Sequence, residues 1–222
     1  MTPEFASAVD PVFLYVLSCM DRIRKGERLD PQSIHATTQS KIRQAGEALQ
    51  GRASQELWRI AMYGLCAWID DLMINHPWEG QRWWENHILE FIFFNTNEAG
   101  TTFFRNASKA QQMASRDALE VYYIAVVLGF RGLYAFPDAA LTAEQFGLPP
   151  TIEKWAERTA SLVQMGPPQW SQKDKVLPIQ GAPPLESQQA LVGALLVFAM
   201  LAFVAVVLGY LFWIWPMHHP SS

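Results

Sequence analysis

The chain has 222 residues, of which 50% are hydrophobic, and its formal net charge at pH 7 is −4. This acidic balance argues against nucleic acid as the main ligand, because phosphate contacts need a basic surface. The two cysteines, Cys19 and Cys66, lie far apart in apolar helical patterns, so they are predicted to be buried, reduced thiols. Before the apolar C-terminal run, about 165 residues remain, enough for one domain with a sizeable core.

Helix start and stop signals divide this domain, and no sustained alternating pattern predicts a strand. An Asp-Pro pair is expected to begin each of the first two helices, and a glycine follows each. The third helix must stop where His76 precedes Pro77. Residues 131–150 are rich in turn-forming residues and are predicted to be a loop. The predicted helices cover residues 10–25, 30–50, 54–75, 83–94, 101–114, 115–128 and 151–165.

The third predicted helix is apolar on most of its sides, which indicates a central helix surrounded by neighbours. Its polar residues Arg59, Tyr63 and Asp70 share one narrow stripe, and Asp71 lies beside this stripe near the C-terminal end. A carboxylate at a helix C-terminus is disfavoured by the helix dipole unless another group pairs with it. Such a pair could bind a neighbouring helix N-terminus or an Arg, or it could dock a partner.

Catalysis by Asp70 and Asp71 is disfavoured, because consecutive helical residues diverge by about 100° and do not converge on one substrate atom. The histidines are too scattered for a metal site, and no phosphate-binding, nucleophile-elbow or zinc-protease motif occurs. Trp78, Trp83 and Trp84 could stack on a ligand, but packing of the turn after the third helix is favoured. We therefore expect no catalytic, cofactor or metal site, and no enzymatic activity.

The C-terminal part predicts a membrane anchor. Residues 166–189 are proline-rich and are predicted to be an extended linker. Residues 190–215 contain no charged side chain and could form a helix of about 39 Å, long enough for a hydrocarbon core of about 30 Å. Residues 216–222 would then form a short tail. A buried core helix is the alternative, but core helices seldom need such an unbroken apolar length.

The charges beside this anchor predict its orientation. Lys173 and Lys175 precede the span, whereas the tail has no Lys or Arg, so the N-terminal domain is expected in the cytoplasm. No secretory signal is recognised at the N-terminus, which agrees with this topology. Within the span, Ala205 and Gly209 are candidates for contact with another membrane helix, since small residues allow close packing in lipid. Small residues are also common in spans that contact nothing.

Four motifs together resemble the DotU/TssL family. They are YGLCAWIDDLMINHPW at residues 63–78, the pair Trp83-Trp84, the run Thr102-Phe103-Phe104, and LEVYYIAVVLGFRGLY at residues 119–134. Their order and the C-terminal anchor both agree with the family. Two departures are Asp71, where Glu is usual, and Ala135, where Arg often follows Tyr.

The resemblance implies an all-α fold, with a hook-like cytoplasmic domain of two small bundles at residues 1–165 and one C-terminal transmembrane helix. It implies a structural subunit of the bacterial inner membrane in the type VI secretion system, linking the membrane core to the baseplate. Expected partners are a TssM/IcmF-type subunit, baseplate components, a TssJ-type outer-membrane lipoprotein indirectly, further copies of the chain, and the lipid bilayer. The candidates for partner binding are Asp70, Asp71, Asn75, Trp78 and Arg131.

Three other functions remain as alternatives. The nearest is the equivalent DotU subunit of a type IVb secretion system, which sequence motifs barely separate from the type VI subunit. A tail-anchored membrane enzyme would need a nucleophile–base pair or a metal set. A tail-anchored adaptor unrelated to secretion is the third, and the neighbouring genes would distinguish it.

Overall fold

Helix α3 (Gln55–Asn75) is the central element of the computed structural model, which describes residues 1–165. It contacts α4, α5, α6 and α7, whose bounds are given below, and Trp68 and Met73 in its second half are fully buried. The prediction of a central helix is therefore confirmed. The described residues form helices only, with no strand, and they belong to a single compact unit.

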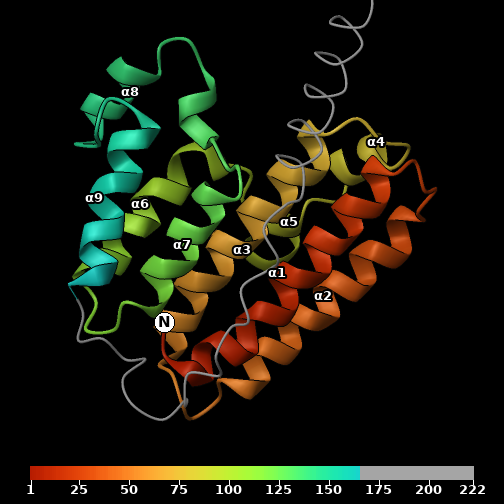
Figure 1. The fold of residues 1–222 in the computed structure, drawn as a ribbon, viewed down its shortest axis with the longest axis horizontal. Coiled ribbons are helices and arrows are strands. Elements are labelled where there is room, and N and C mark those ends of the chain that lie inside the picture. Colours follow the sequence, from red (N-terminus) through yellow and green to blue (C-terminus); the bar gives the residue numbers. More distant parts are fainter. Residues whose placement is uncertain (166–222) are drawn as a thin grey trace, which may run out of the picture. The chain divides into compact units, whose positions relative to one another are not determined.

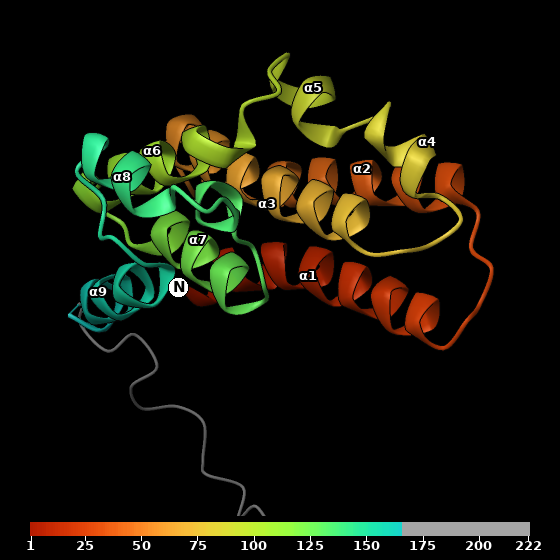
Figure 2. The same ribbon diagram turned by 90° about the horizontal axis from the view of Figure 1, so that it is seen from above.

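Helices α1 (Pro3–Arg24) and α2 (Pro31–Ala48) form an antiparallel pair beside α3 (Figures 1 and 2). The predicted start of α2 is confirmed, because the Asp30 side chain accepts a hydrogen bond from the backbone N–H of Ser33. The predicted start of the first helix at residue 10 is wrong. Helix α1 begins after Thr2, whose side chain caps it, and Pro11 lies inside the helix.

Helices α6 (Ala99–Gln112), α7 (Asp117–Val127) and α9 (Ile152–Gln164) form a second group. Helices α6 and α7 pack on α3 and on each other, and α9 packs on α7 (Figure 1). Aromatic rings fill the space among them, with Phe103 against Tyr122 at 4.6 Å and Phe104 against Trp155 at 5.3 Å between ring centroids. Helix α3 thus lies beside both the α1–α2 pair and the group of α6, α7 and α9.

Two segments differ from the prediction. The helix expected at residues 83–94 is two short helices, α4 (Gln81–Glu85) and α5 (Leu89–Phe94), because the Asp70 side chain binds the backbone where α5 begins. The loop expected at residues 131–150 contains a 3₁₀-helix, η1 (Gly132–Ala135), and helix α8 (Ala139–Gln145). Both are too short to produce a clear apolar period among turn-forming residues.

One described stretch, Asp117–Ala135, is long and apolar enough to cross a membrane by composition alone. It contains α7, which packs against α3 in the core, and 44% of its apolar window is buried inside the domain. The predicted linker at residues 166–189, the predicted membrane helix at 190–215 with Ala205 and Gly209, and the tail at 216–222 lie outside the described residues.

Candidate functional site

Asp70 is buried near the C-terminal end of α3 and makes three hydrogen bonds. Its Oδ1 accepts from Trp84 Nε1 at 2.8 Å and from the backbone N–H of Leu89 at 2.9 Å. Its Oδ2 accepts from the backbone N–H of Glu90 at 2.9 Å. Burial raises the pKa of Asp70 to about 7, although the three donors act in the opposite direction. Asp70 therefore has the structural role left open by the sequence, since it binds the start of α5.

A second buried carboxylate, Glu90, holds the other side of the same segment. Its Oε1 accepts hydrogen bonds from the Tyr63 hydroxyl at 2.7 Å, the Thr96 hydroxyl at 2.8 Å and the backbone N–H of Glu98 at 2.9 Å. The sequence analysis missed this residue. The only signal was an acidic residue within an otherwise apolar helix, α5. Asp70 and Glu90 together fix the segment of residues 81–98 against α3.

Asp71 differs from Asp70 although the two are consecutive. It is half-buried, and Asn75 Nδ2, one helical turn later, donates a hydrogen bond to its Oδ1 at 2.9 Å. Burial raises the pKa of Asp71 to about 6, while Asn75, His76 and Arg131 favour the charged form. Asp71 thus has carboxylate surface left to offer a ligand.

Two adjoining pockets, of about 440 Å³ and about 380 Å³, share Asp71, Asn75 and Ala135 in their linings. We call them together the Asp71 groove. The first pocket also involves α1, through Arg24, and Arg131 from the segment after α7. The second has Asp70 at its floor and Phe136, which is 63% exposed, in its lining.

The five residues that the sequence predicted for partner binding therefore do not form one site. Asp71, Asn75 and Arg131 line the Asp71 groove, and Asp70 lies beneath it with its oxygens already engaged. Trp78 lines neither pocket. Its Nε1 donates to the Met73 carbonyl at 2.8 Å, and it packs the turn after α3, as expected for the tryptophans.

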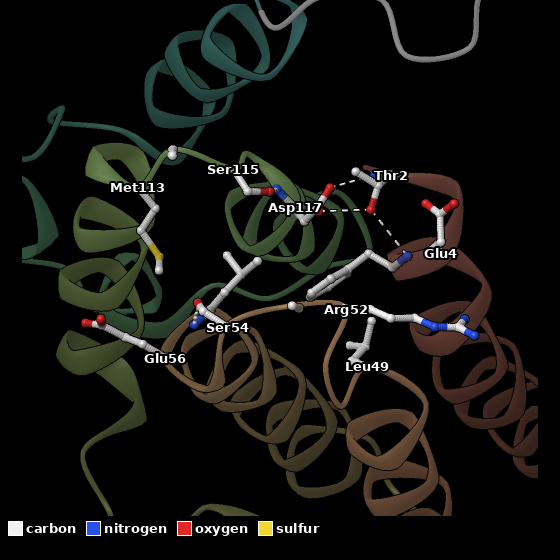
Figure 3. A pocket seen from close by; sticks show the side chains of 13 residues that line it. Thr2, Glu4, Leu49, Arg52, Ser54, Glu56, Met113, Ser115 and Asp117 are labelled. Carbon is white, nitrogen blue, oxygen red and sulfur yellow. Dashed lines mark hydrogen bonds between the residues drawn. The ribbon is translucent and has the colours of Figure 1, made fainter.

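Another pocket, of about 670 Å³, lies where the start of α1 meets the α2–α3 and α6–α7 connections (Figure 3). Asp117 lines it and accepts hydrogen bonds from the backbone N–H of Thr2 at 2.6 Å and the Thr2 hydroxyl at 3.0 Å (Figure 3). This carboxylate holds the first residues of α1. Among residues 1–165, no group of three or more His, Cys, Asp or Glu side chains is placed to hold a metal ion.

The fold is that of solved TssL proteins. The cytoplasmic domain of TssL from Acinetobacter baumannii is 19% identical, with a TM-score of 0.59 over 72% of this chain and 96% of that chain. TssL from Vibrio cholerae is 22% identical, with a TM-score of 0.56 over 72% and 95%. SciP/TssL from enteroaggregative Escherichia coli is 20% identical, with a TM-score of 0.54 over 82% and 98%.

Residues 4–215 match the family described as type VI secretion system protein DotU. The match covers nearly the whole chain, so the protein belongs to the DotU family and is a type VI secretion system component. No curated protein is significantly similar to the chain in sequence. The resemblance found in the four motifs is confirmed, and the matched description is of the type VI system.

Proposed function

We propose that this protein is the structural inner-membrane subunit that links the type VI membrane complex to the cytoplasmic baseplate, and that the Asp71 groove is one of its docking surfaces. The observation that carries the second part is the contrast between two consecutive carboxylates. Both carboxylate oxygens of Asp70 accept hydrogen bonds from the backbone of α5. The carboxylate of Asp71 instead lines a groove, where it can accept a hydrogen bond from a partner.

The position of the groove supports this proposal. Helix α3 ends at the top of Figure 1, whereas α9, after which the chain leaves the described domain, ends at the lower left. The groove therefore lies at the far end of the domain from the point where the predicted linker and anchor begin. Such a placement suits a surface that meets a cytoplasmic partner.

The lining of the groove suggests the chemistry of that partner. Asp71 offers a carboxylate, Asn75 an amide, and Phe136 an exposed aromatic ring. Arg24 and Arg131 line the same groove, so a partner segment that offers a hydrogen-bond donor to Asp71, an acidic side chain to the two Arg residues and an apolar side chain to Phe136 fits this arrangement. A baseplate component or the TssM/IcmF-type subunit would supply it; contact with a TssJ-type lipoprotein would be indirect.

Replacing Asp71 with Asn should weaken binding to such a partner by about tenfold, because a charge-assisted hydrogen bond is lost. Pull-down of separately purified baseplate proteins and the TssM/IcmF-type subunit measures this. Asp10→Asn, at an exposed position of α1, is the matched control. If Asp71→Asn binds every partner as the unaltered protein does and secretion persists, the groove is not a docking site.

The pH dependence gives a second readout of the same variant. A carboxyl group with a pKa raised to about 6 is charged at pH 7.5 and loses its charge as the pH falls. Binding by the unaltered protein should therefore weaken between about pH 7 and pH 5, and binding by Asp71→Asn should change less. His76, Arg131 and Arg24 surround the same groove and are present in both proteins, so the difference between the two curves reports Asp71.

The predicted anchor contributes a separate proposal. Ala205 and Gly209 are proposed to contact another span, either a second copy or the large membrane partner. Replacing both with Leu should weaken association in a membrane two-hybrid assay while insertion is retained, because close helix approach in lipid needs small residues. Full association of the double variant would show that the cytoplasmic domain holds the complex together instead.

A further inference from the structure

A second groove lies between α3 and α6 and shares no lining residue with the Asp71 groove. It has a volume of about 250 Å³. Arg59, Ile60 and Tyr63 line it from α3, and Asn106 and Lys109 line it from α6. Arg59 belongs to the same polar stripe of the central helix as Tyr63 and Asp70. Tyr63 and Asp70 bind residues 84–90, but these contacts give no structural role to Arg59.

The floor of this groove is apolar. Ile60 and Tyr63 are buried, and the Tyr63 ring meets Phe94 edge to face at 5.0 Å between centroids. The three hydroxyls in the lining already have acceptors, because those of Tyr63 and Thr96 donate to Glu90 and that of Thr102 donates to Glu98. The floor can therefore accept an apolar group without leaving a buried polar atom unsatisfied.

The walls carry an excess of positive charge. Arg59 on α3 and Lys109 on α6 are both exposed, and within residues 1–165 neither lies within ion-pair distance of a carboxylate. Glu56 is the only acidic residue in the lining. Two cations on opposite walls against one carboxylate favour an anionic ligand.

The size of the groove points to a side chain rather than a free metabolite, because small-molecule sites usually measure about 300–1,000 Å³. We propose that this Arg59–Lys109 groove binds an acidic segment of a partner protein, with a carboxylate between the two cations and a neighbouring apolar side chain against Ile60 and Phe94. This surface is independent of the Asp71 groove, and the proposal does not rest on the function proposed for that groove.

The test uses the full chain in an uncharged detergent and two fluorescent peptides, one containing Glu-Phe-Glu and the other Gln-Phe-Gln. Fluorescence anisotropy should show saturable binding of the acidic peptide, at least about tenfold weaker binding of its uncharged twin, and weaker binding as salt is raised. The double variant Arg59→Gln, Lys109→Gln should lose about tenfold in affinity for the acidic peptide, with its helical circular dichroism unchanged.

The matched control is Lys154→Gln with Arg158→Gln, two exposed positions of α9 that change the net charge by the same amount. It should bind the acidic peptide as the unaltered protein does. Arg59→Lys keeps the charge and should retain most of the binding. The proposal is overturned if the acidic peptide does not bind, if its uncharged twin binds equally, or if the control loses as much affinity. It is also overturned if phosphate displaces the peptide more than chloride does at equal ionic strength.

Discussion

Replacing Asp70 with Ala should lower the free energy of unfolding by about 3–5 kcal/mol, enough to unfold many domains of ordinary stability. The reason is that Trp84 Nε1 and the backbone N–H groups of Leu89 and Glu90 would all lose their acceptor. Each is buried, so water would not replace the carboxylate without rearrangement of the segment of residues 81–98. Urea denaturation followed by tryptophan fluorescence measures the loss.

Two further variants separate this effect from a general loss of acidic charge. Asp70→Asn should cost less than Asp70→Ala, because the amide oxygen can still accept from Trp84 and Leu89 while its NH₂ group faces the Glu90 N–H. Asp71→Ala should cost little, because within residues 1–165 the one hydrogen bond to the Asp71 side chain comes from the exposed Asn75. Equal stability of Asp70→Ala and Asp71→Ala would contradict the structural assignment of Asp70.

The helices that the sequence predicted well are those whose ends are decided locally. Ser54 caps α3 and Thr151 caps α9, in each case through a hydrogen bond to the backbone three residues later. The C-terminal end of α3 was equally predictable, because His76 precedes a proline. In all three cases the residues that set the boundary are neighbours in the chain.

The boundaries that the sequence predicted wrongly depend on distant partners. Helix α1 begins directly after Thr2 because Asp117, which is 115 residues away in the sequence, accepts two hydrogen bonds from Thr2. With the start of the helix held there, the Asp10-Pro11 pair falls inside α1, where the proline ring is exposed. The break between α4 and α5 likewise depends on the hydrogen bonds from Leu89 and Glu90 to Asp70. The sequence of residues 81–94 alone does not predict it.

The candidate site shows the same division. The contact between Asp71 and Asn75 follows from their spacing of one helical turn and was accessible to sequence reasoning. The approach of Arg131 to the same groove depends on how α7 packs against α3, which no local pattern specifies. The role of Glu90 also required the fold, because its partner Tyr63 is on another helix.

Packing of α7 against α3 should be very sensitive to the size of residue 64. A Cβ atom placed on Gly64 would lie 3.1 Å from the Tyr122 ring, closer than ordinary van der Waals contact. The ring cannot easily withdraw, since it packs against Phe103 at 4.6 Å and its hydroxyl donates to the Ile60 carbonyl at 2.7 Å. A larger side chain at position 64 must therefore push α3 and α7 apart.

Gly64→Leu should lower the free energy of unfolding by about 3 kcal/mol or more, and Gly64→Ala by about 1–2 kcal/mol despite the better helix propensity of alanine. Gly100→Ala in α6 is the control, because a Cβ there meets nothing closer than 3.8 Å, and it should leave stability unchanged or raise it. The cost of Gly64→Ala should also shrink in a Tyr122→Leu background, since the two positions are in contact. Thermal and urea unfolding measure all five variants, the Tyr122→Leu background included. A Gly64→Leu protein as stable as the original would show that α3 and α7 do not pack as closely as described.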